Sequence, residues 1–334
     1  MPTITKVLTA VIFFIGGFFS LVAAELEKPV YTEAGVNAKP KALPATVYLM
    51  TYFVGNGEDG LHLCYSEDGL TWKPIADARS LLQPTVGQHK LMRDPSIVRD
   101  SEGTFHMVWT ISWTQPGIGY ASSKDLIEWS PQRQIPVMEN EPATRNCWAP
   151  ELFYDEPGKT YYIIWASTVP GKFAGIGSED DYNHRQYYVT TRDFQTFSET
   201  RLFFDPGHNV IDAFLARDGK NYLLFYKDET LKPQPKKSIH LAVGNAPTGP
   251  FEPRGEVGHT NWIEGPTALK IGDFWYLYYD CYTKKHYGGV RSSDLKTWEN
   301  ITERLKFPRG MRHGTAFAVE RSVLEKLLTL SKTP

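Results

Sequence analysis

A five-fold internal repeat constrains this 334-residue chain more than any other feature of its sequence. In each copy an aromatic residue follows a turn-forming residue by four positions, and four copies carry Ser or Thr just upstream. Two runs rich in aromatic and β-branched residues, which favour strands, precede each copy. The five copies span residues 68–72, 125–129, 193–197, 247–251 and 294–298. A long-period repeat of strand-rich units predicts an all-β fold, here a β-propeller with five blades.

A second series of short apolar runs alternates with these copies. The runs read RDPSIVRD, WAPELFYD, VIDAFLARD, EGPTALKIGD and RHGTAFAVE. The innermost strand of a propeller blade lines the central axis, and we assign these runs to the five inner strands. The first hairpin, at about 47–72, has no inner strand before it, and the last run, at 312–319, has no hairpin after it. We therefore expect the C-terminal inner strand to complete the first blade and close the ring, which would leave fewer strand edges exposed.

The sequence divides into four parts. Lys6 precedes an apolar stretch and an Ala-Ala pair, which predicts a signal peptide over 1–24 and a secreted or periplasmic protein. The alternative is a membrane anchor, but the stretch is short for a bilayer crossing of about 20 residues. Residues 25–44 are expected to form an extended lead-in, 45–321 one propeller catalytic domain, and 322–334 a short helix and tail. No membrane association is expected after cleavage of the signal peptide.

Composition limits the partners. The formal net charge is −2 and aromatic residues make up 13% of the chain, so a nucleic acid is not an expected partner. The three cysteines, Cys64, Cys147 and Cys281, are scattered and predict free buried thiols rather than a disulfide framework. Nothing in the sequence specifies an oligomeric state.

Three acidic residues start three of the inner-strand runs: Asp94, Asp212 and Glu264. Singly, each could cap a strand or pair with a neighbour such as Arg93. Three at matching places in a ring predict a carboxylate-lined axial pocket. Inverting hydrolysis of a glycosidic bond needs a protonated carboxyl and a carboxylate about 6.5–9.5 Å apart, a separation that residues on different inner strands can meet. Glycoside hydrolysis is therefore the predicted chemistry.

The motifs RDPS, VIDA and EGP, in this order and with WAPE and RHGT, resemble glycoside hydrolase family 43 and its five-bladed relatives. The resemblance covers nearly the whole predicted mature chain. It implies that Asp94 is the general base, Glu264 the general acid and Asp212 the residue that tunes and orients the acid. The family often has Pro after the middle aspartate, where this chain has Ala213.

The proposed roles set requirements on protonation. Glu264 must keep a proton near neutral pH, and a nearby Asp212 carboxylate together with burial would raise its pKa. Asp94 must stay ionised. Arg93 would favour its ionised form only if both side chains faced the axis, whereas adjacent residues in a regular strand face opposite sides.

His313 starts the fifth inner strand. In propellers that this chain resembles, the equivalent histidine helps to hold a hydrated axial cation, often calcium. The alternative is that His313 is hydrogen-bonded to neighbouring backbone and holds no cation. Calcium prefers oxygen ligands, so most of its shell would be water and its role would be structural or electrostatic. No cofactor is expected to be required for the chemistry.

The substrate is expected to be a carbohydrate. Trp148, Arg145 and Arg312 are candidate sugar-binding residues, although Trp148 could instead pack in the core and the arginines could be solvated. Glu151, one place past the strand start, is expected to turn sideways into its blade. An insertion at 168–186 would fold over the channel and favour exo action. The first expectation is a terminal α-L-arabinofuranosyl group. The alternatives are a β-xylosidase, a β-galactosidase, a glycan-binding propeller without activity or, more remotely, a related five-bladed enzyme that acts on anhydro-galactose or fructose units.

Overall fold

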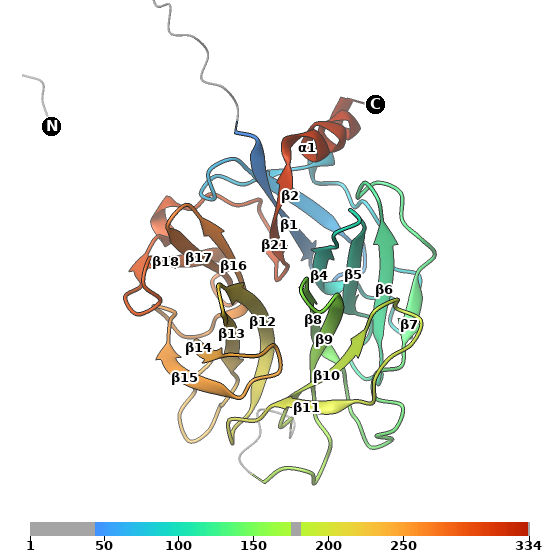
Figure 1. Cartoon of the computed structure of the whole chain (residues 1–334), viewed down its shortest axis with the longest axis vertical. Helices are drawn as coiled ribbons and strands as arrows, with labels where there is room; N and C mark the ends of the chain where they lie inside the picture. The colour runs from blue at the N-terminus through green and yellow to red at the C-terminus, as the bar shows by residue number, and fades with distance from the viewer. Residues whose placement is uncertain (1–43, 175–181, 333–334) are drawn as a thin grey trace, which may run out of the picture. The chain divides into compact units, whose positions relative to one another are not determined.

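The computed structural model describes residues 44–174 and 182–332, and in this part of the chain five antiparallel sheets are arranged around one axis (Figure 1). Each sheet is one blade, with the inner strand nearest the axis. Only one short α-helix accompanies the sheets in the described ranges. The predicted all-β, five-bladed propeller is confirmed.

Blades I to III take up the first part of the chain and its last strands. Blade I comprises β1 (Thr46–Val54), β2 (His62–Ser66) and β3 (Lys73–Pro74), with β20 (Met311–Arg312) and β21 (Ala316–Glu320) as inner strands. Blade II comprises β4 (Arg93–Arg99), β5 (Phe105–Thr110), β6 (Ile118–Ser123) and β7 (Arg133–Ile135). Blade III comprises β8 (Trp148–Asp155), β9 (Thr160–Ser167), β10 (Arg185–Thr191) and β11 (Arg201–Phe204).

Blades IV and V repeat the same plan. Blade IV comprises β12 (Val210–Asp218), β13 (Asn221–Asp228), β14 (Ser238–Gly244) and β15 (Phe251–Glu256). Blade V comprises β16 (Glu264–Ile271), β17 (Phe274–Cys281), β18 (His286–Ser292) and β19 (Glu299–Asn300). The helical elements are η1 (Ala76–Ala78), η3 (Thr302–Arg304), α1 (Arg321–Leu327) and η4 (Leu328–Lys332).

The last strands close the ring. β21 pairs antiparallel with β1, with Ala316 opposite Met50, and β20 continues this edge, with Arg312 opposite Phe53. Blade I is thus built from both ends of the propeller sequence, as predicted. Helix α1 follows β21 directly and buries Leu324 and Leu327 against the core between blades I and II.

The predicted signal peptide (1–24) and lead-in (25–44) lie outside the described residues, apart from Pro44. Within 44–174 and 182–332, no helix is long and apolar enough to cross a bilayer. All three cysteines are buried free thiols, as predicted.

The sequence repeat forms a turn between the third and fourth strands of four blades. In each copy the Ser or Thr hydroxyl accepts the N–H three residues ahead, and the Asp carboxylate accepts two N–H groups. Such side-chain bonds replace the backbone pairing that a turn gives up. The hydroxyl residues are Ser66, Ser123, Thr191 and Ser292, and the carboxylates are Asp68, Asp125, Asp193 and Asp294.

Five hydrophobic clusters fill the spaces between adjacent blades. Each cluster draws buried residues from both of its blades. In ring order from blades I and II, the clusters include Leu49 and Trp109, Val108 and Trp165, Ile164 and Leu224, Phe225 and Leu277, and Met50 and Tyr278. Full burial of one such side chain stabilises the fold by about 1.5–3 kcal/mol. The inner strands therefore stand on a packed scaffold that fixes their positions around the axis.

Candidate active site

A backbone irregularity marks the start of four inner strands. β4, β8, β12 and β16 each shift register against their neighbour within the first few residues. At this point one residue is left-handed: Asp94 (φ 51°), Ala149 (φ 45°), Asp212 (φ 52°) or Gly265 (φ 58°). A bulge interrupts the alternation of side chains. Arg93, which regular alternation would turn away from Asp94, consequently lines the same cavity as Asp94.

Glu264 comes directly before the left-handed residue of its strand, whereas Asp94 and Asp212 are themselves the left-handed residues of theirs. In β16 the left-handed position belongs to Gly265, where a Cβ atom would lie 2.4 Å from the His313 ring. The Gly265 N–H donates to Asp212 Oδ2 at 3.0 Å. The expectation that the three acids occupy equivalent positions is therefore wrong for Glu264, although all three line one cavity.

This cavity has a volume of about 320 Å³, and residues from all five blades line it. Of the predicted residues, it brings together the three acids with Trp148, Arg312 and His313, and it leaves out Arg145. The acids that line it are Asp94, Asp212, Glu229 and Glu264; the basic residues are Arg93, Lys227, Lys237, Arg312 and His313; the aromatic residues are Trp113, Trp148, Trp262 and Tyr282.

Asp94 is held as a carboxylate. The Thr110 hydroxyl donates to its Oδ2 at 2.9 Å, and His313 Nδ1 lies 3.3 Å from its Oδ1. Burial acts to raise the pKa of Asp94, but the hydrogen bond and charge of His313, with Arg93 and Thr110, outweigh burial and bring the pKa to about 2. Asp94 is thus ionised at any pH at which an enzyme ordinarily works, as a general base requires.

Glu264 lies between two cations. Lys227 Nζ is 3.2 Å from its Oε2, and Arg312 Nη2 donates to its Oε1 at 2.7 Å. Burial acts to raise the pKa of Glu264, but Lys227 and Arg312, followed by His313, lower it below its usual value. The expectation that Glu264 has a raised pKa is therefore wrong for the free site, because it took account of burial and Asp212 but not of these cations.

Asp212 has the opposite balance. Burial raises its pKa to about 6, and the negative charges of Glu264 and Asp94 add to this, while His313 and Lys227 act against it. Asp212 and Glu264 influence each other, so they titrate as a pair. In mildly acidic solution the pair as a whole therefore retains a proton.

His313 is a cation at neutral pH. Burial acts to lower its pKa, but the hydrogen bond to Asp94 and the charges of Asp212, Asp94 and Glu264 raise it to about 9. No cluster of three His, Cys, Asp or Glu side chains suited to a metal occurs in the described ranges, so water would have to supply most of the ligands of a calcium ion here. A hydrated axial cation stays a prediction, which a calcium titration of the melting temperature would test.

Similarity to known proteins agrees with this fold. Residues 44–325 match the family described as a probable glycosyl hydrolase domain, which is related to glycoside hydrolase family 43. The chain belongs to this family. The description of this family agrees with the chemistry that the sequence motifs predicted.

Curated relatives of this family 43-related chain are α-L-arabinofuranosidases. One from Bifidobacterium longum subsp. longum is 26% identical over 284 residues, which cover 72% of this chain and 26% of that protein. A non-reducing end α-L-arabinofuranosidase from Bacteroides ovatus is 28% identical over 200 residues, which cover 55% of this chain and 33% of that protein. The chain thus matches a third or less of the length of these relatives.

A solved structure shares the fold. The α-L-arabinofuranosidase from Lactobacillus brevis superposes with a TM-score of 0.51 at 17% identity, covering 63% of this chain and 72% of that one. At this identity the likeness concerns the fold alone.

The rim beside blade III is aromatic. Trp148 donates its indole N–H to the Trp113 carbonyl at 3.0 Å, and its ring packs 4.8 Å from Tyr182 and 5.0 Å from His184. Trp148 therefore combines a packed ring with a place on the cavity wall. The guanidinium carbon of Arg145 lies 4.1 Å from the centroid of the Tyr182 ring, and Arg145 does not line the cavity.

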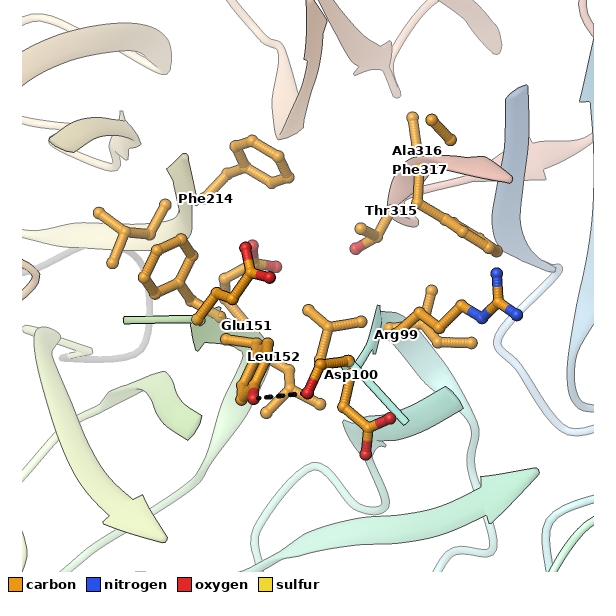
Figure 2. Close-up of a pocket in the computed structure, with 16 residues that line it drawn as sticks. Arg99, Asp100, Glu151, Leu152, Phe214, Thr315, Ala316 and Phe317 are labelled. Atoms are coloured by element: carbon orange, nitrogen blue, oxygen red, sulfur yellow. Dashed lines mark hydrogen bonds between the residues drawn. The ribbon is translucent and has the colours of Figure 1, made fainter. Parts of the chain in front are cut away.

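Glu151 faces the axis and not the interior of its blade. It belongs to a second cavity of about 430 Å³, lined by later residues of the same inner strands, among them Phe214, Thr315 and Phe317. Figure 2 shows its carboxyl pointing into this cavity. The Ser96 hydroxyl donates to Glu151 Oε2 at 2.7 Å, and burial raises the pKa of Glu151 to about 8. Glu151 is thus a neutral acid at the other end of the axis, and the expectation that it turns sideways is wrong.

Several residues of the site lie outside the inner strands and were missed in the sequence. The Lys227 side chain on β13 is only 2% exposed, and its Nζ lies 2.8 Å from Glu229 Oε2. Glu229 also pairs with Lys237. Asp280 on β17 accepts from Arg312 Nε at 2.8 Å. Lys227 could have been found from the sequence, because it stands inside the apolar run NYLLFYKD and a charge in a buried strand needs a partner.

Proposed function

We propose that this chain is an inverting, exo-acting glycosidase that removes terminal α-L-arabinofuranosyl groups and is exported from the cell. The observation that carries the proposal is one cavity that holds Asp94, kept ionised, together with the Asp212–Glu264 pair, which retains a proton in mild acid. Two carboxyl groups with opposed protonation are what hydrolysis of a glycosidic bond requires, whereas a glycan-binding propeller has no need of them.

In the proposed reaction Asp94 accepts a proton from a water molecule while the water oxygen attacks the anomeric carbon. The glycosidic bond breaks, and the leaving oxygen takes the proton of Glu264. Asp212 positions the site through the Gly265 N–H and keeps a proton available within the coupled pair. Because Lys227 and Arg312 lower the pKa of Glu264, we expect the reaction to be fastest in mildly acidic solution.

Two observations support the exo action and the choice of sugar. Walls from all five blades surround the cavity, which favours a terminal sugar over an extended chain passing through. Both curated relatives are named as α-L-arabinofuranosidases. The centre of the insertion predicted to fold over the channel, residues 175–181, lies outside the described residues.

The test is sugar release by the purified chain from aryl α-L-arabinofuranoside, β-xyloside and β-galactoside, with Asp94→Ala as the inactive control. We expect release from the arabinoside, with NMR showing the product first as the inverted anomer. Retention of configuration would exclude the inverting mechanism, and preference for another glycoside would change the sugar. Glycan binding without release from any substrate would favour the non-catalytic propeller.

Glu264→Gln gives a sharper test of the acid. It should reduce release from alkyl arabinosides, whose leaving groups need protonation, by about 10²–10⁴-fold, the usual contribution of a general acid. Release from a dinitrophenyl arabinoside should fall far less. Equal losses on both substrates would remove Glu264 as the acid. Recovery of the mature protein in the medium or periplasm, with its N-terminus near Glu25, would test export.

A further inference from the structure

Four of the five basic residues in the catalytic cavity have carboxylate partners. Lys227 pairs with Glu229 and Glu264, Lys237 with Glu229, Arg312 with Glu264 and Asp280, and His313 with Asp94. Arg93 forms no ion pair within 44–174 and 182–332. Asn56 lies between Arg93 and Glu58: its amide donates to Glu58, and its carbonyl oxygen accepts from Arg93. The charge of Arg93 acts on Glu58 and Asp94, but neither carboxylate contacts it directly.

Arg93 is nevertheless held firmly. Its Nη1 donates to Asn56 Oδ1 at 2.9 Å, and its guanidinium carbon lies 4.7 Å from the Phe53 ring and 4.5 Å from the Trp113 ring. Contacts with aromatic faces fix a guanidinium without neutralising its charge. The bulge at Asp94 directs Arg93 to the cavity wall. Arg93 is thus a positioned cation with N–H groups left to donate.

An unpaired cation is unfavourable in a glycosidase pocket. The transition state resembles an oxocarbenium ion, so positive charge builds up on the sugar, and a nearby guanidinium opposes it. With Asp280 included, five carboxyl groups face five cations, and two of these groups, Asp212 and Asp280, have pKa values of about 6. In mild acid the site therefore carries excess positive charge, which a neutral glycan would leave uncompensated.

We propose that Arg93 binds an anionic substituent, a carboxylate or a sulfate, on the glycan that carries the terminal sugar. Guanidinium pairs with either group through two parallel hydrogen bonds. The contact between Arg93 and Trp113, whose side chain is 38% exposed, places this cation toward the mouth of the cavity. The substituent therefore lies on the leaving-group side. The inference rests on the proposed function only in taking the ligand to be a glycan.

The test measures binding by the full chain, so that it does not depend on turnover. Matched oligosaccharide pairs are titrated by calorimetry: a xylo-oligosaccharide with and without a glucuronosyl branch, and a galacto-oligosaccharide with and without a sulfate ester. We expect at least one anionic member to bind about tenfold more tightly than its neutral counterpart, with the difference lost in Arg93→Gln and partly kept in Arg93→Lys. Preference for one pair identifies carboxylate or sulfate as the group bound.

Arg254→Gln is the matched control, because Arg254 is exposed and pairs with Glu252 on the outermost strand of blade IV. Its discrimination should equal that of the wild type, and melting temperatures check that every variant folds. Equal affinity for charged and neutral glycans, discrimination that survives in Arg93→Gln, or no binding of any charged glycan at millimolar concentration would overturn the inference. Hydrolysis of a neutral arabinoside alongside any of these results would leave the proposed function intact.

Discussion

Lys227→Met removes the cation closest to Glu264 Oε2 and should shift the pH dependence of catalysis upward. The ammonium lies 3.2 Å from this oxygen and stabilises the ionised form of Glu264. Without it the carboxylate is less stable, so the pKa of Glu264 rises and the acid stays protonated to higher pH. The basic limb of kcat/KM on alkyl arabinosides should therefore move to higher pH.

The size of the shift follows from the geometry. At 3.2 Å and an effective dielectric constant of about 20, two unit charges interact by about 5 kcal/mol, or between three and four pKa units at about 1.4 kcal/mol each. Arg312 remains on the other oxygen, and the site relaxes. We therefore expect an increase of about two units in both the basic limb and the pKa of Glu264.

Two readouts check this prediction. The pH profile of kcat/KM is measured for the wild type and Lys227→Met, and ¹³C NMR of labelled glutamate follows Glu264 directly. Lys270→Met serves as the control, because Lys270 pairs with Asp218 in an exposed position on β16. Loss of a buried ion-pair partner costs about 3–5 kcal/mol, so Lys227→Gln is a second variant in case the first is unstable. A folded variant whose basic limb stays in place or moves to lower pH would refute the reasoning.

Two further predictions follow from the buried charges. The raised pKa of Glu151, about 8 against 4.5, implies that its contribution to stability is greatest below about pH 4.5 and is lost, by up to about 5 kcal/mol, as the pH rises from there to about 8. Glu151→Gln should remove this part of the pH dependence, and a melting temperature with unchanged pH dependence in the variant would contradict it. His313→Asn removes the cation that holds the pKa of Asp94 near 2, so the acidic limb of kcat/KM should rise by at least one unit, whereas an unmoved limb would show that His313 does not keep the base ionised.

The order of the blades around the ring could be predicted because two series of motifs repeat along the sequence, with one copy of each per blade. The Ser/Thr-Asp turns and the inner-strand runs alternate, and only closure of blade I by β21 gives every blade an inner strand. The meeting of Asp94, Asp212 and Glu264 in one cavity follows from that order. Their catalytic roles stay predictions until the variants are measured.

The electrostatics of the site could not be predicted in the same way. Alternation in a regular strand would place Arg93 away from Asp94, and the left-handed backbone at Asp94 that reverses this has no distinct signal in RDPS. Lys227 reaches Glu264 from a neighbouring blade, a contact between residues 37 positions apart that no local pattern encodes. Both effects depend on how separate strands meet around the axis.

Closure of the ring by β20 and β21 also sets the order in which the site is made during translation. Asp94 leaves the ribosome early, but Arg312 and His313, which contact Glu264 and Asp94, belong to the last strands of the propeller. A nascent chain that ends before them has an unpaired edge on β1 and lacks two of the cations that set the protonation of the acids. The complete set of site residues therefore assembles only when synthesis of the propeller is finished, so the proposed activity would begin only once the fold is complete.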